Sequence, residues 1–453
     1  MSFAHHQENW VEKLIWWNVL LVTILGPLAF GTVEEWSIAL FELNALLVAV
    51  ALAGAWLLRP ESFELKRWRI AAPFAALVAF NALQFAVPHG TLDRHATAES
   101  AFKLLALLVY FLAALHLLRE GARRRQLMFV LSALGFALAL FAIAQKLTYN
   151  GKLYWVRPVS PYVAPFGPYA NYNHFAGAME LLLPVPLAWW LLARAEIGKR
   201  IIAFWAAVAM IVALVYSLSR GGLLALGFQL AALFIFLWRE RANTPQRMKT
   251  TQTPLLIGVA LTVSLLLATG VAYDQLAARF QSLRQGGQEY SLVTRRAFWS
   301  DSWQMFRAHP LTGVGLGAFP TAYPQFGHSS AQNERLETVH NDYLQLLTDA
   351  GLVGAVLLLW FCFEAVRQLR STRQRWMDLR SNDRAACLGG WLAVLGLAVH
   401  SLLDFNLQIT ANAWLCLCLL ALAISSASAD LAAHRKTAPI NGAVGGENAI
   451  EVV

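Results

Sequence analysis

The sequence predicts an all-α membrane protein with about twelve transmembrane helices, and three observations lead to this fold class. Of the 453 residues, 58% are hydrophobic and only 14% are charged, against about 25% in an ordinary soluble domain. The apolar residues form runs as long as a membrane-crossing helix needs. Most basic residues fall in every second segment between these runs. This pattern excludes a soluble enzyme, a disordered chain, a coiled coil and a disulfide scaffold, and the run length argues against a transmembrane β-barrel.

Twelve apolar segments are long enough to be candidate spans. The first follows Lys13 and lacks a small-residue cleavage pattern, so we expect an uncleaved anchor and not a signal peptide. The seventh and eighth spans turn around within a few residues at Ser219–Gly222. The predicted spans cover residues 14–30, 36–58, 70–87, 101–118, 127–145, 173–193, 201–218, 221–238, 255–272, 346–366, 387–403 and 412–429.

The basic residues predict that both ends of the chain are cytoplasmic. Of the 36 Lys and Arg residues, 24 lie in the N-terminal segment, alternate loops and the C-terminal tail, as the positive-inside rule requires. Residues 272–345 form a loop too long to obey that rule, and we expect it in the periplasm of a bacterial cell between spans nine and ten. Topology thus explains the net charge of +9, and we expect no nucleic-acid partner.

We expect three regions along the chain. Residues 1–145 form a five-helix membrane region, and residues 146–430 form a second membrane region that includes the long loop. Residues 431–453 are small and polar and predict a disordered cytoplasmic tail. The cysteines lie in or beside apolar segments without C-x-x-C spacing, so we expect small core residues and neither metal ligands nor disulfides. They are Cys362, Cys387, Cys416 and Cys418.

Polar chemistry gathers in four segments on the predicted outer face. The first, Gln145–His174, contains four prolines and several aromatic residues, so we expect an extended chain and no helix. Its flat apolar faces can stack on sugar rings, or they can form an interfacial aromatic belt. Asn171, Asn173 and His174 open the next helix, where capping is the alternative to a functional role.

Arginines occur in the second and third segments. Arg220, in Ser217–Gly222, can either snorkel to lipid headgroups or hold a phosphate in its planar fork. Arg295 and Arg296 lie on an expected amphipathic helix that runs to Phe306 and ends in glycine turns. Both can equally be ordinary solvated charges.

A histidine and an aspartate complete the outer polar groups. His340 lies where a helix enters a membrane span, which suits proton transfer, although capping or an interface role fits equally well. No second histidine lies three to five residues away and no cysteine is near, so we do not expect a metal site. Asp404 can orient a histidine, balance an arginine or be a plain exposed carboxylate. The shared face of all four segments predicts one site at the outer membrane edge.

Several motifs together resemble the O-antigen ligase and O-antigen polymerase superfamily. The resemblance covers about residues 160–425 and is strongest over 217–354, whereas the first five spans match only in being apolar. The motifs are S-L-S-R-G-G at Arg220, R-x-x-x-W at Arg295 leading into H-P-L-x-G-V-G-L-G, V-H-N-D-Y-L-Q-L-L-x-D-A-G-L-V-G at His340, and N-x-N-H-F-A-G at Asn173.

The resemblance implies an inner-membrane glycosyltransferase in lipopolysaccharide or surface-polysaccharide assembly. Such an enzyme takes a glycan from undecaprenyl diphosphate in the periplasm and transfers it to a lipid A core, a growing glycan or a protein. Arg220 and Arg295 would grip the donor diphosphate, with Arg296 as the alternative to Arg295. His340 would act as the base on the acceptor hydroxyl.

The resemblance also implies substrate-binding positions at Asn173 and Asp404. Guanidinium groups can stabilise charge on a leaving phosphate without a metal, so we expect neither metal nor cofactor. The expected partners are the lipid-linked donor, the acceptor and membrane lipids. Ligase and polymerase share the donor chemistry and both remain open.

A transporter or flippase of lipid-linked glycans is the alternative function. Transporters place polar residues near the bilayer midplane, in broken helices and related halves. Here the spans are polar mainly at one end, and no internal repeat occurs. Glu42 and Glu180 are exceptions inside spans two and six, and each can mark a pathway, a buried hydrogen bond or a contact with the site. A membrane scaffold without chemistry leaves the one-sided arginines and histidine unexplained.

Overall fold

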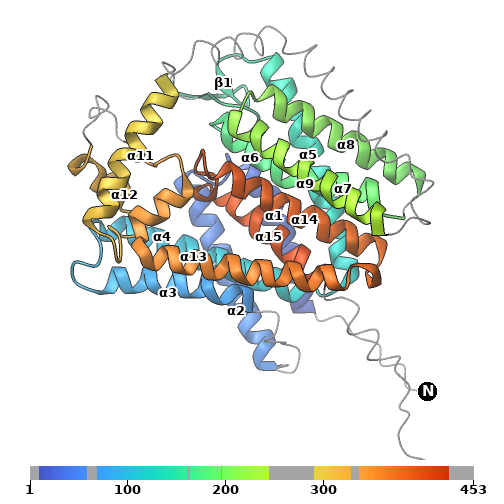
Figure 1. The fold of residues 1–453 in the computed structure, drawn as a ribbon, viewed down its shortest axis with the longest axis horizontal. Helices are drawn as coiled ribbons and strands as arrows, with labels where there is room; N and C mark the ends of the chain where they lie inside the picture. The colour runs from blue at the N-terminus through green and yellow to red at the C-terminus, as the bar shows by residue number, and fades with distance from the viewer. Residues whose placement is uncertain are drawn as a thin grey trace, which may run out of the picture.

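The computed structural model describes residues 10–58, 69–160, 164–194, 196–243, 290–327 and 336–427. In this part of the chain the protein is a bundle of long helices with one short hairpin (Figure 1). The elements are α1 (Trp10–Leu28), α2 (Glu35–Leu58), α3 (Ala72–Ala86), α4 (Arg94–Leu117), α5 (Gly121–Leu147), β1 (Lys152–Leu153), β2 (Arg157–Pro158), α6 (Tyr172–Leu182), α7 (Pro184–Leu192), α8 (Ile197–Tyr216), α9 (Arg220–Asn243), α11 (Tyr290–Ala308), α12 (Phe319–Ala322), η3 (Tyr323–Gln325), α13 (Asp342–Gln374), η4 (Trp376–Asp378), α14 (Ser381–His400), η5 (Asn406–Gln408) and α15 (Thr410–Ala427).

The predicted class of helical, multi-pass membrane protein is confirmed. Within the described residues, ten helical segments are long and apolar enough to cross a membrane. The predicted eleventh span coincides with α14, which is not among those ten and which begins with the polar run S-N-D-R. The predicted ninth span, 255–272, and the tail, 431–453, lie outside the described residues. The orientation of the chain across the membrane also stays a prediction.

The centre of the bundle is made by α6, α7, α14 and α15. The apolar windows of Tyr172–Leu192 and Thr410–Ala427 are each 83% buried, and α14 packs against α15, α7, α9 and α6. The predicted sixth span is interrupted at Leu183, between α6 and α7, because Pro184 cannot donate a backbone hydrogen bond. Buried helices of this kind can hold polar side chains in fixed positions.

The outer helices present apolar side chains to the surroundings. On α2, six large aliphatic residues are each at least 60% exposed: Leu40, Leu43, Leu46, Leu47, Val50 and Leu57. A soluble protein rarely exposes so many apolar groups side by side. This surface therefore suits the hydrocarbon of a bilayer.

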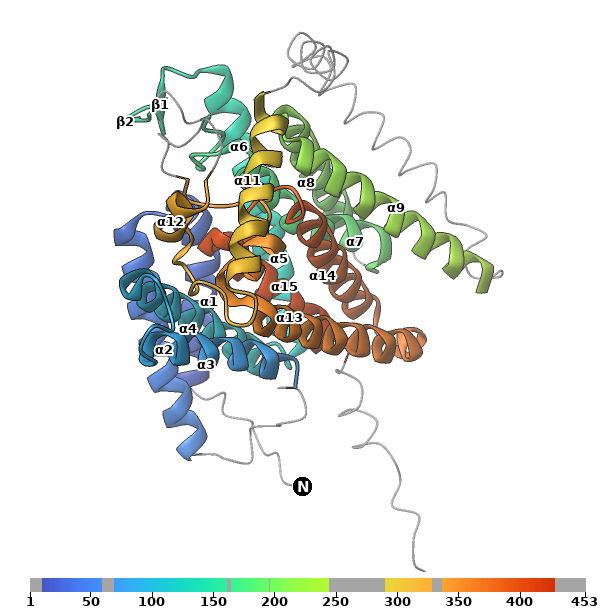
Figure 2. The same ribbon diagram turned by 60° about the vertical axis from the view of Figure 1, so that its left-hand side comes forward.

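The predicted glycine turns after α11 are confirmed, and they join α3 to α13. Gly313, Gly315 and Gly317 all have positive φ, at 70°, 111° and 83°, a conformation that glycine adopts without steric cost. The Gly315 N–H donates to Asp349 O at 3.0 Å, and the Gly317 N–H donates to Asp349 Oδ2 at 3.3 Å. Gln84 of α3 also donates to Asp349 O at 3.1 Å. The turns thus brace the first part of α13, beside which α11 and α12 lie (Figure 2).

Candidate functional site

A buried carboxylate, Asp404, lies in the short connection between α14 and α15 and is 1% exposed. Its Oδ1 lies 3.4 Å from His340 Nδ1 and 3.9 Å from His174 Nε2. Its Oδ2 lies 3.6 Å from Arg295 Nη2, and the Phe405 N–H donates to Oδ1 at 2.9 Å. We call Asp404, His340, Arg295 and His174 the Asp404 cluster. It brings together the segments that begin α6 and α13, the helix α11 and the α14–α15 connection.

His340 reaches this cluster because the chain turns sharply just before α13. Its φ is 55°, a left-handed conformation that is uncommon for a residue with a side chain. The cap of α13 is the next residue, Asn341, whose Oδ1 accepts hydrogen bonds from the N–H groups of Tyr343 and Leu344 at 3.0 Å each. The His340 side chain is 27% exposed. Capping was one of the open interpretations of His340, and the structure shows that Asn341 performs this role instead.

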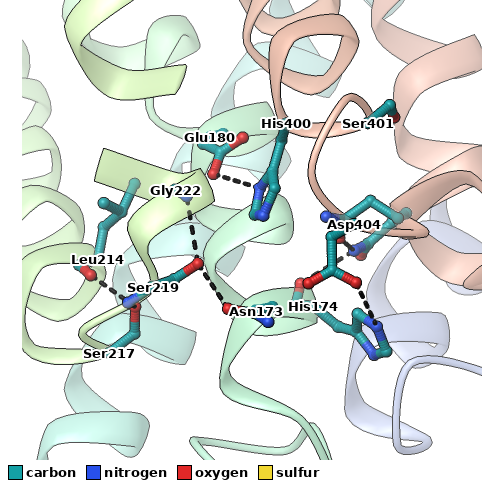
Figure 3. A network of polar contacts seen from close by, with 12 residues as sticks. Asn173, His174, Glu180, Leu214, Ser217, Ser219, Gly222, His400, Ser401 and Asp404 are labelled. Carbon is teal, nitrogen blue, oxygen red and sulfur yellow. Dashed lines mark hydrogen bonds and ion pairs between the residues drawn. The ribbon is translucent and has the colours of Figure 1, made fainter. Parts of the chain in front are cut away.

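Asn173 links the start of α6 to the start of α9. The N-cap of α6 is Asn171, which accepts a hydrogen bond from the Asn173 N–H at 2.8 Å. The Asn173 side chain instead accepts from the Ser219 hydroxyl at 2.8 Å, and Ser219 Oγ accepts from the Gly222 N–H at 3.2 Å (Figure 3). Because Arg220 is the first residue of α9, this link places Arg220 beside the segment that carries His174.

His174 is the member of the cluster that the sequence interpretation did not name as a site residue, having left capping and a functional role both open for it. Its ring stands edge-on to Phe405 with centroids 4.5 Å apart, and His340 contacts the same ring from 4.9 Å. Within the described residues, His174 Nε2 is buried without a hydrogen-bond partner. Its place directly after Asn173 in the N-x-N-H run was the one signal in the sequence that could have indicated it.

The reversal between α8 and α9 differs in detail from the expectation. Leu218, with φ of 60°, makes the turn, and the glycines after Arg220 are helical and serve close packing. A Cβ on Gly221 would lie 2.5 Å from ring atoms of His400, and a Cβ on Gly222 would lie 2.8 Å from Ala176. The glycines thus let α9 begin directly against α6 and α14.

The two adjacent arginines of α11 lie in different surroundings. Arg295 is 24% exposed and points its guanidinium at Asp404, whereas Arg296 is exposed. The amphipathic helix expected here is confirmed, since Phe298 and Met305 are buried in a small apolar cluster with Val339. The geometry therefore brings Arg295 to the site and leaves Arg296 outside it.

Glu180 lies close to Gly222 at the start of α9 and is fully buried. Its Oε1 lies 2.8 Å from His400 Nδ1 (Figure 3). Of the interpretations left open for Glu180, a buried hydrogen bond is the one observed. Glu42, the other exception, interacts electrostatically with Lys103 of α4.

The surroundings of Asp404 keep this carboxyl ionised. Burial by itself raises the pKa of Asp404, but the hydrogen bond with His340 and the charges of His174, His340 and His400 outweigh burial. The net effect holds the pKa of Asp404 well below its ordinary range. A carboxylate in this state can orient and charge-stabilise the histidines around it.

We expect Asp404→Asn to destabilise the protein at neutral pH more than in acid. A carboxyl whose folded pKa is lowered contributes stability above its unfolded pKa of about 3.9, and this contribution is lost as pH falls through the folded value. In thermal unfolding of the detergent-solubilised protein, the melting temperature of Asp404→Asn should lie below that of the wild type, and this difference should narrow below about pH 4. The exposed carboxylate Asp378 is the matched control, and Asp378→Asn should leave the curve unchanged. A gap of constant size at every pH contradicts this electrostatic account.

The fold and the Asp404 cluster define a multi-pass membrane protein that gathers arginine, histidine and aspartate where its helices end. Residues 205–359, about a third of the chain, match the family model described as O-Antigen ligase. The match confirms the resemblance to the O-antigen ligase and O-antigen polymerase superfamily over these residues. Arg220, Arg295, Arg296 and His340 lie inside the matched range. No curated protein matches the chain.

Proposed function

We propose that this protein transfers a glycan from undecaprenyl diphosphate to an acceptor hydroxyl at the periplasmic face of the bacterial inner membrane. The observation that carries this proposal is the Asp404 cluster, where a histidine, an arginine and a buried carboxylate meet. The family match supports a ligase- or polymerase-type enzyme in general. The lipid-linked donor explains why such a site lies at the end of membrane helices.

His340 is the proposed general base. We assign the ring proton to Nδ1, which lies 3.4 Å from Asp404 Oδ1, so that the neutral ring presents the Nε2 lone pair to the acceptor. Nε2 takes the hydroxyl proton as the acceptor oxygen bonds to the anomeric carbon of the donor sugar. The bond from that carbon to the diphosphate oxygen breaks, and the diphosphate leaves with the electron pair.

Arg220 and Arg295 are the proposed grip on the diphosphate. Negative charge develops on the leaving oxygen, and fixed guanidinium groups near a low-dielectric bilayer edge stabilise such charge strongly. Because these cations are supplied by the chain, we propose that transfer needs no metal ion. Asn173 supports the grip indirectly, through its bond to Ser219 beside Arg220.

Purified protein in nanodiscs, supplied with an undecaprenyl diphosphate-linked glycan, tests the proposal. We expect the glycan to appear on an acceptor and undecaprenyl diphosphate to be released. Parallel reactions with lipid A core, with lipid-linked glycan alone and with an acceptor protein distinguish ligase, polymerase and protein-modifying activity. If the protein reconstituted in vesicles moves the donor from one leaflet of the bilayer to the other without any transfer, the flippase alternative is favoured instead.

Arg220→Ala is expected to lower kcat/KM for the donor by about 10²-fold to 10³-fold, as removal of a preorganised donor group does. Arg220→Lys should recover little of this loss, because an ammonium cannot form the two parallel hydrogen bonds of the guanidinium fork. Steady-state kinetics with varied donor measure both effects. The control is Arg370→Ala, an exposed arginine near the other end of α13. Wild-type turnover by the lysine variant would rule out the bidentate grip.

A further inference from the structure

A cavity of about 600 Å³ opens next to the candidate site, within the size range of small-molecule binding pockets. It lies between the end of α5, the irregular chain after β2 and the turn from α8 to α9. None of its lining residues belongs to the Asp404 cluster, so the proposed reaction does not account for it. The side chains that matter here are Lys146, Tyr149, Phe166, Tyr172, Tyr216 and Leu218.

The cavity has a rigid aromatic floor and a polar rim. Phe166 and Tyr216 are buried and stand edge to face with centroids 5.9 Å apart. The loop that carries Phe166 is held by a backbone bond from the Tyr172 N–H to Ala164 O at 3.0 Å. At the rim, the Tyr149 side chain is 43% exposed beside the exposed Lys146.

This combination suits a saccharide. Sugar rings carry apolar C–H faces that pack on flat aromatic rings, while their hydroxyl and acidic groups need polar or cationic partners. Tyr149 and Tyr172 supply rings, and Lys146 supplies a cation. A purely interfacial aromatic belt requires no cavity, since it only has to face headgroups.

Two of the chain segments that form the walls of the cavity continue directly into the candidate site. Tyr172 is followed by Asn173 and His174, and Leu218 is followed by Ser219 and Arg220. The Ser219–Asn173 hydrogen bond of 2.8 Å ties these two walls together. The lining residues Tyr172 and Leu218 therefore each lie two positions along the chain from a proposed functional residue, His174 of the Asp404 cluster and Arg220 of the diphosphate grip.

We propose that this cavity binds sugar residues of a glycan substrate during transfer, an inference that rests on the proposed function. The saccharide chemistry is common to the donor glycan and to a glycan acceptor. The cavity holds the sugars adjoining the reacting end, so that the rings of Tyr149 and Tyr172 contribute to affinity and to the choice of glycan.

Tyr149→Ala and Lys146→Ala, both at exposed positions, test this subsite by kinetics. Each should raise KM by about tenfold for one glycan substrate, the effect of about 1.4 kcal/mol of lost contact, with kcat little changed. Tyr149→Phe, which keeps the ring, should stay near wild type. Varying donor and acceptor separately identifies the substrate whose sugars occupy the cavity. Val156→Ala, at an exposed position between β1 and β2, is the matched control.

Saturation-transfer NMR with lipid-free donor oligosaccharide and core oligosaccharide separates the subsite from the reaction. Binding should persist in His340→Ala, which we expect not to transfer, and should weaken in Tyr149→Ala. If transfer occurs but Tyr149→Ala and Lys146→Ala alter neither KM nor oligosaccharide binding, the subsite is overturned while the proposed function stands. If no transfer occurs yet the oligosaccharide signal depends on Tyr149, the proposed function falls and the saccharide site stands. The absence of oligosaccharide binding by the wild-type protein overturns the subsite.

Discussion

Replacing His340 with alanine is expected to lower the rate of glycan transfer by about 10²-fold to 10⁴-fold, the usual contribution of a positioned general base. The reason is geometric: Asp404 lies 3.4 Å from Nδ1 and can hold the ring with Nε2 available for the acceptor proton. Transfer to a defined acceptor, followed as released undecaprenyl diphosphate, measures the loss. Donor binding should be nearly unchanged, because the base acts on the acceptor.

The matched control for this prediction is His95→Ala. His95 lies near the start of α4, is 83% exposed and lies 3.4 Å from the nearby Glu99, so its loss should leave transfer intact. Membrane insertion should be the same for both variants, and thermal unfolding should show that each is folded at the assay temperature. Full activity of a well-folded His340→Ala protein would remove His340 from the reaction.

Arg295→Ala and Arg296→Ala are expected to differ sharply although the two residues are neighbours. Arg295 directs Nη2 toward Asp404 at 3.6 Å, whereas Arg296 is exposed. Loss of Arg295 should lower kcat/KM by about 10²-fold to 10³-fold. Loss of Arg296 should change it by about twofold or less, as for surface substitutions.

This adjacent pair controls for helix propensity and for expression, since both substitutions are made on α11 in the same turn. Donor titrations with each variant measure the difference. Equal and large losses would mean that α11 acts through general positive charge, and the specific pairing of Arg295 with Asp404 would then be unnecessary.

The sequence predicted the site in outline because local patterns and topology carry that information. Alternating basic segments indicated which loops share a face, and this alone suggested that Arg220, His340 and Asp404 converge. The glycine turns followed from backbone chemistry that is local to each residue, whereas the interruption of the sixth span before Pro184 was not predicted. The spacing of Arg295 to Trp299 favoured Arg295 but left Arg296 open as the alternative, because neighbouring residues on a helix share the same local sequence and point in different directions.

Other features of the site depend on contacts between distant segments. From its local sequence alone, His174 is one more polar residue at the start of a helix. Only the packing of α6 against the α14–α15 connection brings its Nε2 to 3.9 Å from Asp404 Oδ1. Glu180 had three open interpretations until His400, 220 residues away, was found 2.8 Å from it. The cavity beside Leu218 likewise needs three separate segments to exist.

The sequence by itself determined that this chain is a helical membrane protein and which motifs it carries, because hydropathy and charge are properties of each residue that do not depend on how the chain packs. The tertiary structure decided which of the candidate side chains meet. Distances between groups on different helices are set by how those helices pack, and Asp404 became the centre of the site only when α6, α11 and α13 were brought against one buried carboxylate.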